Sequence, residues 1–301
     1  MASIWQLTVI AFPRKTIVLG VVLNRNTSTS KGSSSFVKSA LAIASSYFRE
    51  TCGIAKLKIS MGDQQLTTET DRRGSFFFET DHAFDESHNL ELSFKGKPLL
   101  FEPDHVNIHR LRETGTLVIS DIDDTVLVSY TNKTLKRLIT TLFRSYTRRK
   151  PVDETCQIFD TLGRHQNDHV YVSRSEYNLF PMLSNFIKHH DLPSGPLLLT
   201  PFLSLWELVR NKKDTDFKVK TINFLLDHSN HERVVLIGDD TQHDLQVYAK
   251  IAKTYGSRIH KIFIRQTDPG VDKRESPGWS QLVENIENMV YYNDETNLNN
   301  L

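Results

Sequence analysis

The sequence is poor in the features that mark secreted and membrane-spanning proteins. It has only two cysteines in 301 residues, Cys52 and Cys156, and they lie in different halves of the chain, so we expect no disulfide framework. No apolar run approaches the ~18 residues that a membrane-spanning helix needs. The N-terminus also lacks the basic stretch that precedes the apolar part of a signal peptide. These absences predict a cytoplasmic protein.

The sequence also lacks an excess of charge of either sign. Lysine and arginine total 37 residues against 36 for aspartate and glutamate, so the net charge is +1 and we expect no nucleic-acid partner. Hydrophobic residues make up 39% and charged residues 24% of the chain, which is typical of a folded protein. Any preference for an anionic partner must therefore come from a local patch.

Residues 1–113 contain short runs rich in β-branched and aromatic residues. Such runs, several with alternating apolar and polar residues, predict strands. The expected strands are WQLTVIAF, TIVLGVVL, AKLKIS, GSFFFET and NLELSFKG. A polar loop (26–35) and one helix (36–50) interrupt them. Many strands with few helices indicate a small β-sandwich-like domain.

The pattern changes after Thr114. Apolar runs now alternate with longer helix-like segments, which predicts a parallel, Rossmann-type α/β sheet that is buried on both faces. The expected strands are TLVIS, HVYVS, GPLLL, RVVLI and IHKIFI. We assign residues 114–278 to this domain and residues 279–301 to a C-terminal helix followed by a polar tail.

Carboxylates follow two of these strands. Asp121 and Asp123 come after the first, and Asp239 and Asp240 end the run VVLIGDD. In parallel sheets the ligand crevice lies at the carboxyl ends of the strands. Close carboxylates there suit Mg²⁺ binding, a nucleophile with an acid/base partner, or the capping of a helix. A calcium loop is excluded, because Val126 and Asn132 stand where that loop needs glycine and glutamate.

Two further signals are weaker. Ser173 ends a predicted strand, where its hydroxyl could donate to a phosphate oxygen or simply cap a helix. Lys218 and Lys220 precede a predicted helix face. A lysine beside a phosphate would neutralise charge in the transition state, although lysines at a helix start are usually solvated.

The order carboxylate pair, hydroxyl, lysine, carboxylate pair resembles that of the haloacid-dehalogenase superfamily of phosphotransferases. Three stretches closely resemble the actin-patch-associated phosphatidate phosphatase family: ISDIDDT, VYVSRSEYNLFPMLSNFIKHHDLPSGPLLL and VVLIGDDTQHDLQVYAKIAKTYGSRIHKIFIR. They fall within residues 114–265. The stretch TETDRRGSFFFE is similar to the β-rich domain that precedes the catalytic domain in many relatives. The resemblance implies Mg²⁺-dependent hydrolysis of phosphatidate to diacylglycerol.

The resemblance also implies a role for each residue. Asp121 would be the nucleophile that forms an aspartyl-phosphate, and Asp123 the general acid that protonates the leaving alkoxide and later activates water. The phosphoryl oxygens would be held by Thr125, Ser173 and Lys218, where Lys218 is preferred to Lys220 for its spacing from Ile222. The Mg²⁺ ligands would be Asp121, the carbonyl of Asp123, Asp239 and Asp244.

The chain departs from the family pattern at three places. The usual Ser-Pro is Ser175-Glu176, the usual arginine after GPLLL is Thr200, and the usual Ser-Gly is Asp240-Thr241. None is a core catalytic position, but the last two could alter the choice of substrate. A phosphomonoesterase acting on a soluble substrate and a non-catalytic module that binds anionic lipid are therefore the alternatives.

The segment from Val126 to Val152 contains seven basic residues and no acidic one. Its apolar residues recur at helical spacing, which predicts a helix with one face on the core. The basic side is either a solvated face or a surface that attracts an anionic membrane or substrate. We assign that attraction to Arg148, Arg149 and Lys150, so the protein could be peripheral at membranes.

Overall fold

The computed structural model describes most of the chain. The described residues are 2–23, 53–61, 64–81, 84, 90–101, 105–112, 115–128, 147, 149–200, 215–241, 243–284, 286 and 288–298. The chain divides into two compact units: residues 1–111, 175–185 and 199–211 form the first, and residues 112–174, 186–198 and 212–301 form the second. The domain boundaries at residues 113 and 278 remain predictions from the sequence.

The first unit contains two β sheets. One has the order β5-β2-β1-β8, with β9 also paired to β1, and the other has the order β4-β3-β6-β7. The strands of the first sheet are β1 (Ser3–Ala11), β2 (Thr16–Leu23), β5 (Ser75–Thr80), β8 (Leu100–Phe101) and β9 (Val106–Arg110). Those of the second are β3 (Lys56–Met61), β4 (Gln64–Glu69), β6 (Leu90–Phe94) and β7 (Lys97–Pro98).

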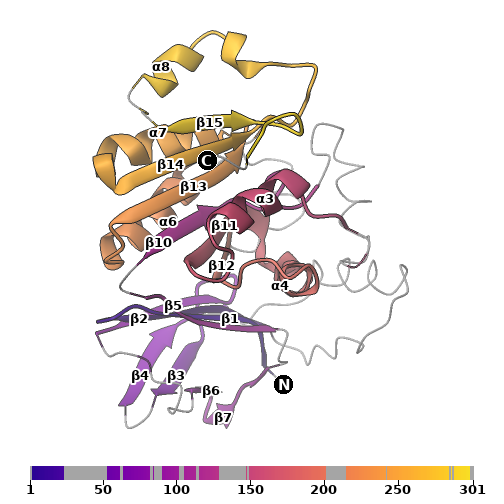
Figure 1. The fold of residues 1–301 in the computed structure, drawn as a ribbon. Coiled ribbons are helices and arrows are strands. Elements are labelled where there is room, and N and C mark those ends of the chain that lie inside the picture. The colour runs from indigo at the N-terminus through magenta and orange to yellow at the C-terminus, as the bar shows by residue number, and fades with distance from the viewer. Residues whose placement is uncertain are drawn as a thin grey trace. The chain divides into compact units, whose positions relative to one another are not determined.

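The two sheets of the first unit share one core. Their buried side chains form a single cluster that joins Leu7 and Val9 of β1 to Leu57 and Ile59 of β3 and Leu92 of β6. Each of these five side chains is at most 1% exposed. Burial of apolar area on both inner faces stabilises this arrangement of two layers, which is seen in Figure 1. The β-sandwich-like prediction is thereby confirmed.

The second unit is built on a six-stranded sheet with the order β12-β11-β10-β13-β14-β15. The strands are β10 (Thr116–Ser120), β11 (Asp168–Glu176), β12 (Leu197–Thr200), β13 (Arg233–Asp239), β14 (Ile259–Arg265) and β15 (Met289–Tyr292). Strand β10 pairs in parallel with both β11 and β13. Residues 117–119 and 234–237 are completely buried, as expected for strands covered on both faces. The parallel α/β prediction is confirmed.

Helices cover both faces of this sheet. They are α3 (Asp153–Thr161), α6 (Thr215–His228) and α7 (Asp244–Tyr255). The other described helices are α4 (Phe180–His189) and the short α8 (Trp279–Val283), and 3₁₀ turns lie at Tyr177–Leu179, Gly256–Arg258 and Lys273–Glu275. After β10 the chain passes through α3 to β11, which lies towards the β12 edge of the sheet. After β13 it passes through α7 to β14, which lies towards the opposite, β15 edge. Right-handed connections in opposite directions place α3 and α7 on opposite faces (Figure 1). The strand order therefore reverses between β10 and β13.

Strand β15 differs from the prediction of a polar tail after the C-terminal helix. Met289–Tyr292 pairs in parallel with β14 and adds a sixth strand. The ring of Tyr292 is buried 6.3 Å from that of Phe263, and a hydrogen bond of 2.9 Å joins its hydroxyl to Thr155 Oγ1. Four aromatic and apolar residues flanked by polar ones are too short a pattern for a confident strand prediction.

Several predicted segments lie outside the described residues. These are the loop at 26–35, the helix at 36–50, Arg148, and residues 129–146 of the basic segment. Among the helices that the structure does describe, none combines the length and the apolar character needed to cross a membrane.

Candidate active site

The site begins where β10 and β13 end side by side. Ser120, the last residue of β10, pairs with Ile237 of β13, and the backbone N–H of the next residue, Asp121, donates to Ile237 O at 2.8 Å. Asp239 is the last residue of β13. This register brings the carboxylates of Asp121 and Asp239 to the same edge of the sheet, at the point where the strand order reverses. That point is the usual ligand crevice of an open α/β sheet.

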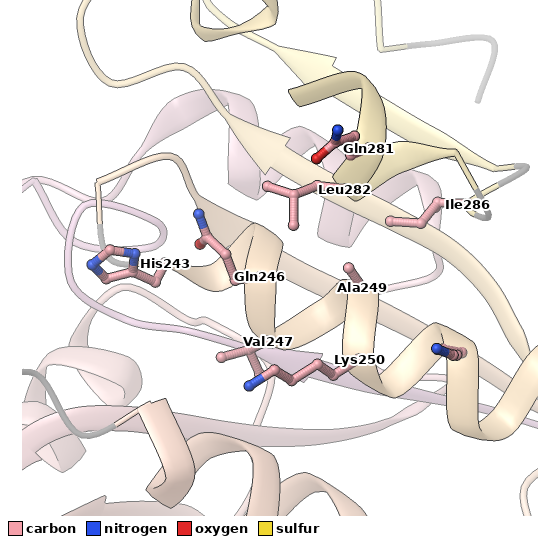
Figure 2. Close-up of a pocket in the computed structure, with 9 residues that line it drawn as sticks. His243, Gln246, Val247, Ala249, Lys250, Gln281, Leu282 and Ile286 are labelled. Carbon is pink, nitrogen blue, oxygen red and sulfur yellow. The ribbon is translucent and has the colours of Figure 1, made fainter. Parts of the chain in front are cut away.

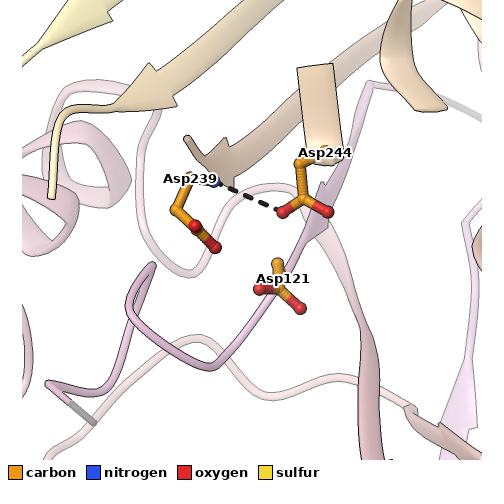
Figure 3. A group of neighbouring side chains, drawn as sticks. All are labelled: Asp121, Asp239 and Asp244. Atoms are coloured by element: carbon orange, nitrogen blue, oxygen red, sulfur yellow. Dashed lines mark hydrogen bonds between the residues drawn. The ribbon is translucent and has the colours of Figure 1, made fainter. Parts of the chain in front are cut away.

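Asp244, the first residue of α7, completes a cluster of three carboxylates. One carboxylate oxygen from each of Asp121, Asp239 and Asp244 lies within 4.8 Å of the other two, and all three residues are 0% exposed. Figure 3 shows the three side chains converging, with the backbone N–H of Asp239 donating to Asp244 Oδ2 at 3.3 Å. Gly238 makes this approach possible, because a Cβ there would lie 2.6 Å from Asp244 Oδ2.

Lys218 of α6 is buried among these carboxylates. Its Nζ lies 2.8 Å from Asp121 Oδ1 and 2.5 Å from Asp244 Oδ1, and its side chain is 2% exposed. Lys220, two residues further along α6, is exposed. The lysine that family spacing selects from the sequence is therefore the one that reaches the cluster.

The cluster combines three buried carboxylates with one ammonium group, so negative charge is in excess. Burial and this excess together shift the pKa values of Asp239, Asp244 and Lys218. Burial raises the pKa of Asp239 well above its ordinary value, and repulsion from Asp244 and Asp121 adds to the rise. Burial also raises the pKa of Asp244 to about 6, although Lys218 opposes the shift. Burial alone would lower the pKa of Lys218, but Asp121 and Asp244 raise it above its ordinary value.

These residues fit a hard divalent cation. Among the described residues, Asp121 Oδ2 has no hydrogen-bond donor, and Oδ1 has only the ion pair with Lys218. A buried carboxylate oxygen without a donor is costly, and the neighbouring carboxylates repel it further. Oxygen ligands from one or two carboxylates are what Mg²⁺ takes from a protein. The cluster can therefore hold a divalent metal ion.

Asp123 and Thr125 lie on a tight loop after β10. Asp124 has a positive φ of 58°, and its N–H donates to Leu127 O at 2.8 Å, so the chain turns back on itself. Aspartate tolerates this left-handed conformation better than most residues. Thr125 Oγ1 donates to Asp239 Oδ2 at 3.4 Å, which ties the loop to the carboxylate cluster.

Ser173 faces Asp123 rather than capping a helix. It lies inside β11, which continues to Glu176, so the N-cap alternative is wrong. Its Oγ donates to Asp123 Oδ2 at 3.2 Å, and Ser173 itself is completely buried. The structure thus brings Asp121, Asp123, Thr125, Ser173, Lys218, Asp239 and Asp244 together in one unit.

Asp240 and Thr241 hold neighbouring parts of the site in position. The sequence showed this pair only as a departure from the family pattern and did not reveal that role. The backbone N–H of Thr241 donates to Asp239 Oδ1 at 2.5 Å, and its hydroxyl contacts the same oxygen. The Asp240 carboxylate accepts hydrogen bonds from Thr267 Oγ1 at 2.6 Å and from the Tyr291 hydroxyl at 2.8 Å. Thr241 therefore orients a carboxylate of the cluster, while Asp240 fastens β13 to the segment after β14.

The remaining predicted positions lie outside this cluster of contacts. Thr200 Oγ1 donates to Ser175 O at 3.2 Å, and Glu176 is buried. Arg149 is only 5% exposed, whereas Lys150 is exposed. Of these two basic residues, only Lys150 could meet a membrane surface directly.

A groove lies beside the acidic cluster. A small cavity of about 200 Å³ is lined by Asp239 and Asp244 among others, and it shares three lining residues, His243, Gln246 and Leu282, with a groove of about 500 Å³. In Figure 2 the groove runs between α7 and α8, with Gln281 and Leu282 of α8 lying over α7. The second unit thus has open space next to its carboxylates.

Comparison with known proteins agrees with this geometry. Residues 116–266 match the model of the family described as phosphatidate phosphatase APP1, catalytic domain. The chain belongs to this family. The match begins at β10 and ends one residue after β14, so it includes every residue of the acidic cluster.

Two curated relatives are about a quarter identical to this chain over the segments that align. Uncharacterized protein C29B5.04c of Schizosaccharomyces pombe is 25% identical over 181 residues, which cover 59% of this chain and 30% of that protein. Phosphatidate phosphatase APP1 of Saccharomyces cerevisiae is 26% identical over 152 residues, which cover 50% of this chain and 26% of that protein. The matched segments therefore span less than a third of either relative.

One solved structure matches most of this chain, but only weakly. The crystal structure of XAC1771, a carbohydrate acetylesterase from Xanthomonas citri, matches at 12% identity over 96% of this chain and 67% of that one, with a TM-score of 0.32. A TM-score this low carries no argument about function.

Proposed function

We propose that the protein is a Mg²⁺-dependent phosphatidate phosphatase that hydrolyses phosphatidate to diacylglycerol through an aspartyl-phosphate on Asp121. One observation carries the proposal. In a chain of the phosphatidate phosphatase APP1 catalytic-domain family, the completely buried Asp121 stands beside Asp239, Asp244 and Lys218 at the reversal of strand order. Buried nucleophilic carboxylates beside a cation site are suited to phosphoryl transfer.

Asp121 and Asp123 would perform the two halves of the reaction. A carboxylate oxygen of Asp121 attacks phosphorus, and the bond between phosphorus and the glycerol oxygen breaks. That alkoxide is a poor leaving group, so the protonated carboxyl of Asp123 donates a proton to it as the bond breaks. The same carboxylate then takes a proton from the water that cleaves the aspartyl-phosphate. The hydrogen bond from Ser173 Oγ to Asp123 Oδ2 holds this acid in place.

Lys218 places a positive charge beside the nucleophile. Its ammonium lies 2.8 Å from Asp121 Oδ1 and forms an ion pair with a carboxylate that has no exposed surface. The same cation lies where it can offset the charge of an arriving phosphate, with Thr125 and Ser173 supplying hydroxyl donors. A lysine therefore serves both the resting site and the transition state.

Asp121, Asp239 and the carbonyl of Asp123 would hold the Mg²⁺ ion, with Asp244 as a further candidate ligand. When bound, the ion reduces the repulsion between the anionic nucleophile and the phosphate dianion. Thr241 keeps Asp239 in position for this role through its two contacts to Oδ1.

We also propose that the protein works in the cytoplasm, at the surface of anionic membranes and without a nucleic-acid partner. Lys150, with Arg148 and Arg149, was assigned to this attraction from the sequence, and Lys150 is exposed in the structure. The substrate would remain in the membrane while its phosphate enters the site.

The test is phosphate release from a panel of substrates, with and without Mg²⁺. The panel contains phosphatidate, lysophosphatidate and a small soluble phosphomonoester. We expect Mg²⁺-dependent release, fastest from phosphatidate. Release from the soluble ester alone would contradict the lipid assignment and favour a soluble phosphomonoesterase. Absence of turnover on every substrate, with lipid binding retained, would favour the non-catalytic alternative.

A further inference from the structure

The four-stranded sheet of the first unit presents lysines on its outer face. Along β3, Leu57, Ile59 and Met61 are buried in the core, whereas Lys56 and Lys58, which alternate with them, are exposed. Successive side chains of a strand point to opposite faces of a sheet, so both lysines point away from the core. Because β3 lies between β4 and β6, these lysines stand on an interior strand of the sheet (Figure 1).

Hydroxyl side chains flank Lys58 on both neighbouring strands. Lys58 pairs with Thr67 of β4 on one side and with Ser93 of β6 on the other. Adjacent strands lie ~4.8 Å apart, so the three polar side chains form one continuous row across the sheet. Lys95 follows in the turn after β6, with its Nζ 5.1 Å from the centre of the Phe94 ring.

These residues line a shallow cavity of about 550 Å³, which we call the lysine cavity. Its ten lining residues include Ile54, Lys56, Lys58, Thr67, Ser93 and Lys95. Three of them are basic, and none of the ten is acidic. Glu69 faces the same side, 3.9 Å from Lys56 Nζ, and Glu91 lies towards the other end of β3, paired with Ser60. The lysine cavity is therefore a positively charged recess with hydroxyl donors, which is complementary to phosphate groups.

An exposed isoleucine stands at the edge of the lysine cavity. Ile54 is 71% exposed and has a positive φ of 51°, a conformation that is strained for a β-branched residue. The surrounding backbone imposes it: the Ile54 N–H donates to Asp71 O at 3.1 Å, and a Cβ at Gly53 would lie 2.6 Å from Arg72 O. A strained residue that is also apolar and exposed suggests a contact made outside the folded chain.

We propose that the lysine cavity and Ile54 together bind the surface of an anionic phospholipid bilayer. The three lysines and the hydroxyls of Thr67 and Ser93 contact lipid phosphate groups, and Ile54 enters the interfacial layer beside them. Basic residues contribute electrostatic attraction and an apolar side chain contributes burial, and the two together give firmer peripheral binding than either alone. This inference goes beyond the phosphatase activity, because vesicle binding needs no turnover.

The first experiment measures co-sedimentation of the full chain with vesicles of phosphatidylcholine, with or without phosphatidylserine. The variant Lys58→Gln/Lys95→Gln should bind the anionic vesicles ~25-fold more weakly, at about 5-fold per lysine, and the loss should shrink at high salt. The control Arg14→Gln/Arg110→Gln removes two exposed charges elsewhere in the same unit, one from the turn between β1 and β2 and one from β9, and should bind like wild type. Wild-type binding by the lysine variant would overturn the proposal.

A second variant separates lipid contact from folding. Asparagine accepts a left-handed backbone more readily than isoleucine, so Ile54→Asn should keep or raise the melting temperature. We expect it nevertheless to weaken binding to anionic vesicles several-fold at both low and high salt. Unchanged binding would overturn the role of Ile54, and so would a lower melting temperature. Phosphate release from a soluble phosphomonoester should be unaffected in every variant, so this test fails or succeeds independently of the phosphatase proposal.

Discussion

Lys218 Nζ lies 2.8 Å from Asp121 Oδ1, and neither side chain is more than 2% exposed. The two residues come from α6 and from the end of β10, 97 positions apart in the chain. This buried pair couples stability to catalysis. Loss of Lys218 leaves two buried carboxylates without their cation, whereas loss of Asp121 still leaves Lys218 its contact with Asp244.

Replacing the nucleophile should separate activity from folding. In Asp121→Asn the amide cannot attack phosphorus, so phosphate release should fall by about 10⁴-fold or more. The melting temperature should hold or rise, because one of three mutually repelling carboxylates is gone. The matched control, Asp160→Asn on the exposed side of α3, should keep wild-type turnover. Full activity in Asp121→Asn would rule out the assigned mechanism.

Removing Lys218 should lower both the stability and the activity of the protein. Lys218→Met keeps most of the side-chain volume but leaves Asp121 and Asp244 without their buried cation. The free energy of unfolding should fall by about 3–5 kcal/mol without metal, and turnover should fall by at least ~100-fold. Chemical denaturation and phosphate release measure the two effects. Lys220→Met, at an exposed position two residues along α6, is the control, and an equal loss there would contradict the assignment.

Metal binding should restore the stability that the protein loses when the carboxylate cluster deprotonates as pH rises. Without metal, the raised pKa of Asp239 and the pKa of about 6 for Asp244 mean that the folded protein holds protons that the unfolded chain has released. This contribution to stability is present at low pH and is lost as pH rises through the folded pKa values.

Mg²⁺ binds the deprotonated carboxylates, so its effect on the melting temperature should be small below pH 6 and should grow above it. Activity should disappear in excess chelator and return with Mg²⁺. Ca²⁺ should inhibit, because its longer bonds and larger ligand number favour binding both oxygens of Asp121. An Mg²⁺ effect of equal size at every pH would contradict a carboxylate site.

Acid should destabilise the second unit through His169. Burial lowers the pKa of this histidine, which is 3% exposed, to about 4. Between these two pKa values the unfolded chain binds a proton at this histidine and the folded protein does not. This contribution to stability is therefore complete above the ordinary histidine pKa of about 6.5 and is lost as pH falls through 4.

The variant His169→Gln cannot take up a proton, so it should lose less stability on acidification, by about 3 kcal/mol between pH 7 and 4. Urea denaturation across this pH range measures the slope, and parallel slopes for wild type and His169→Gln would count against the prediction.

Local patterns determined much of the fold and of the site. The apolar run 116–120 and the run 233–237 are long enough, and bounded clearly enough, to predict buried parallel strands. Since the carboxyl ends of such strands meet at one edge, the sequence also predicted that Asp121 and Asp239 would lie close together. Alternation along β3 similarly indicates which of its residues face outward. Each of these inferences rests on the pattern of apolar and polar residues within one short segment.

Other features were decided only by tertiary structure. Neither the 2.5 Å contact of Lys218 with Asp244 nor the placement of Ser93 beside Lys58 follows from any local pattern. The burial of Arg149 and the addition of β15 to the sheet are of the same kind. The periodicity of a segment indicates which of its faces is buried. Which other element packs against that face depends on strand register and helix packing. Those are set by contacts between residues far apart in the chain, which no short stretch of sequence contains.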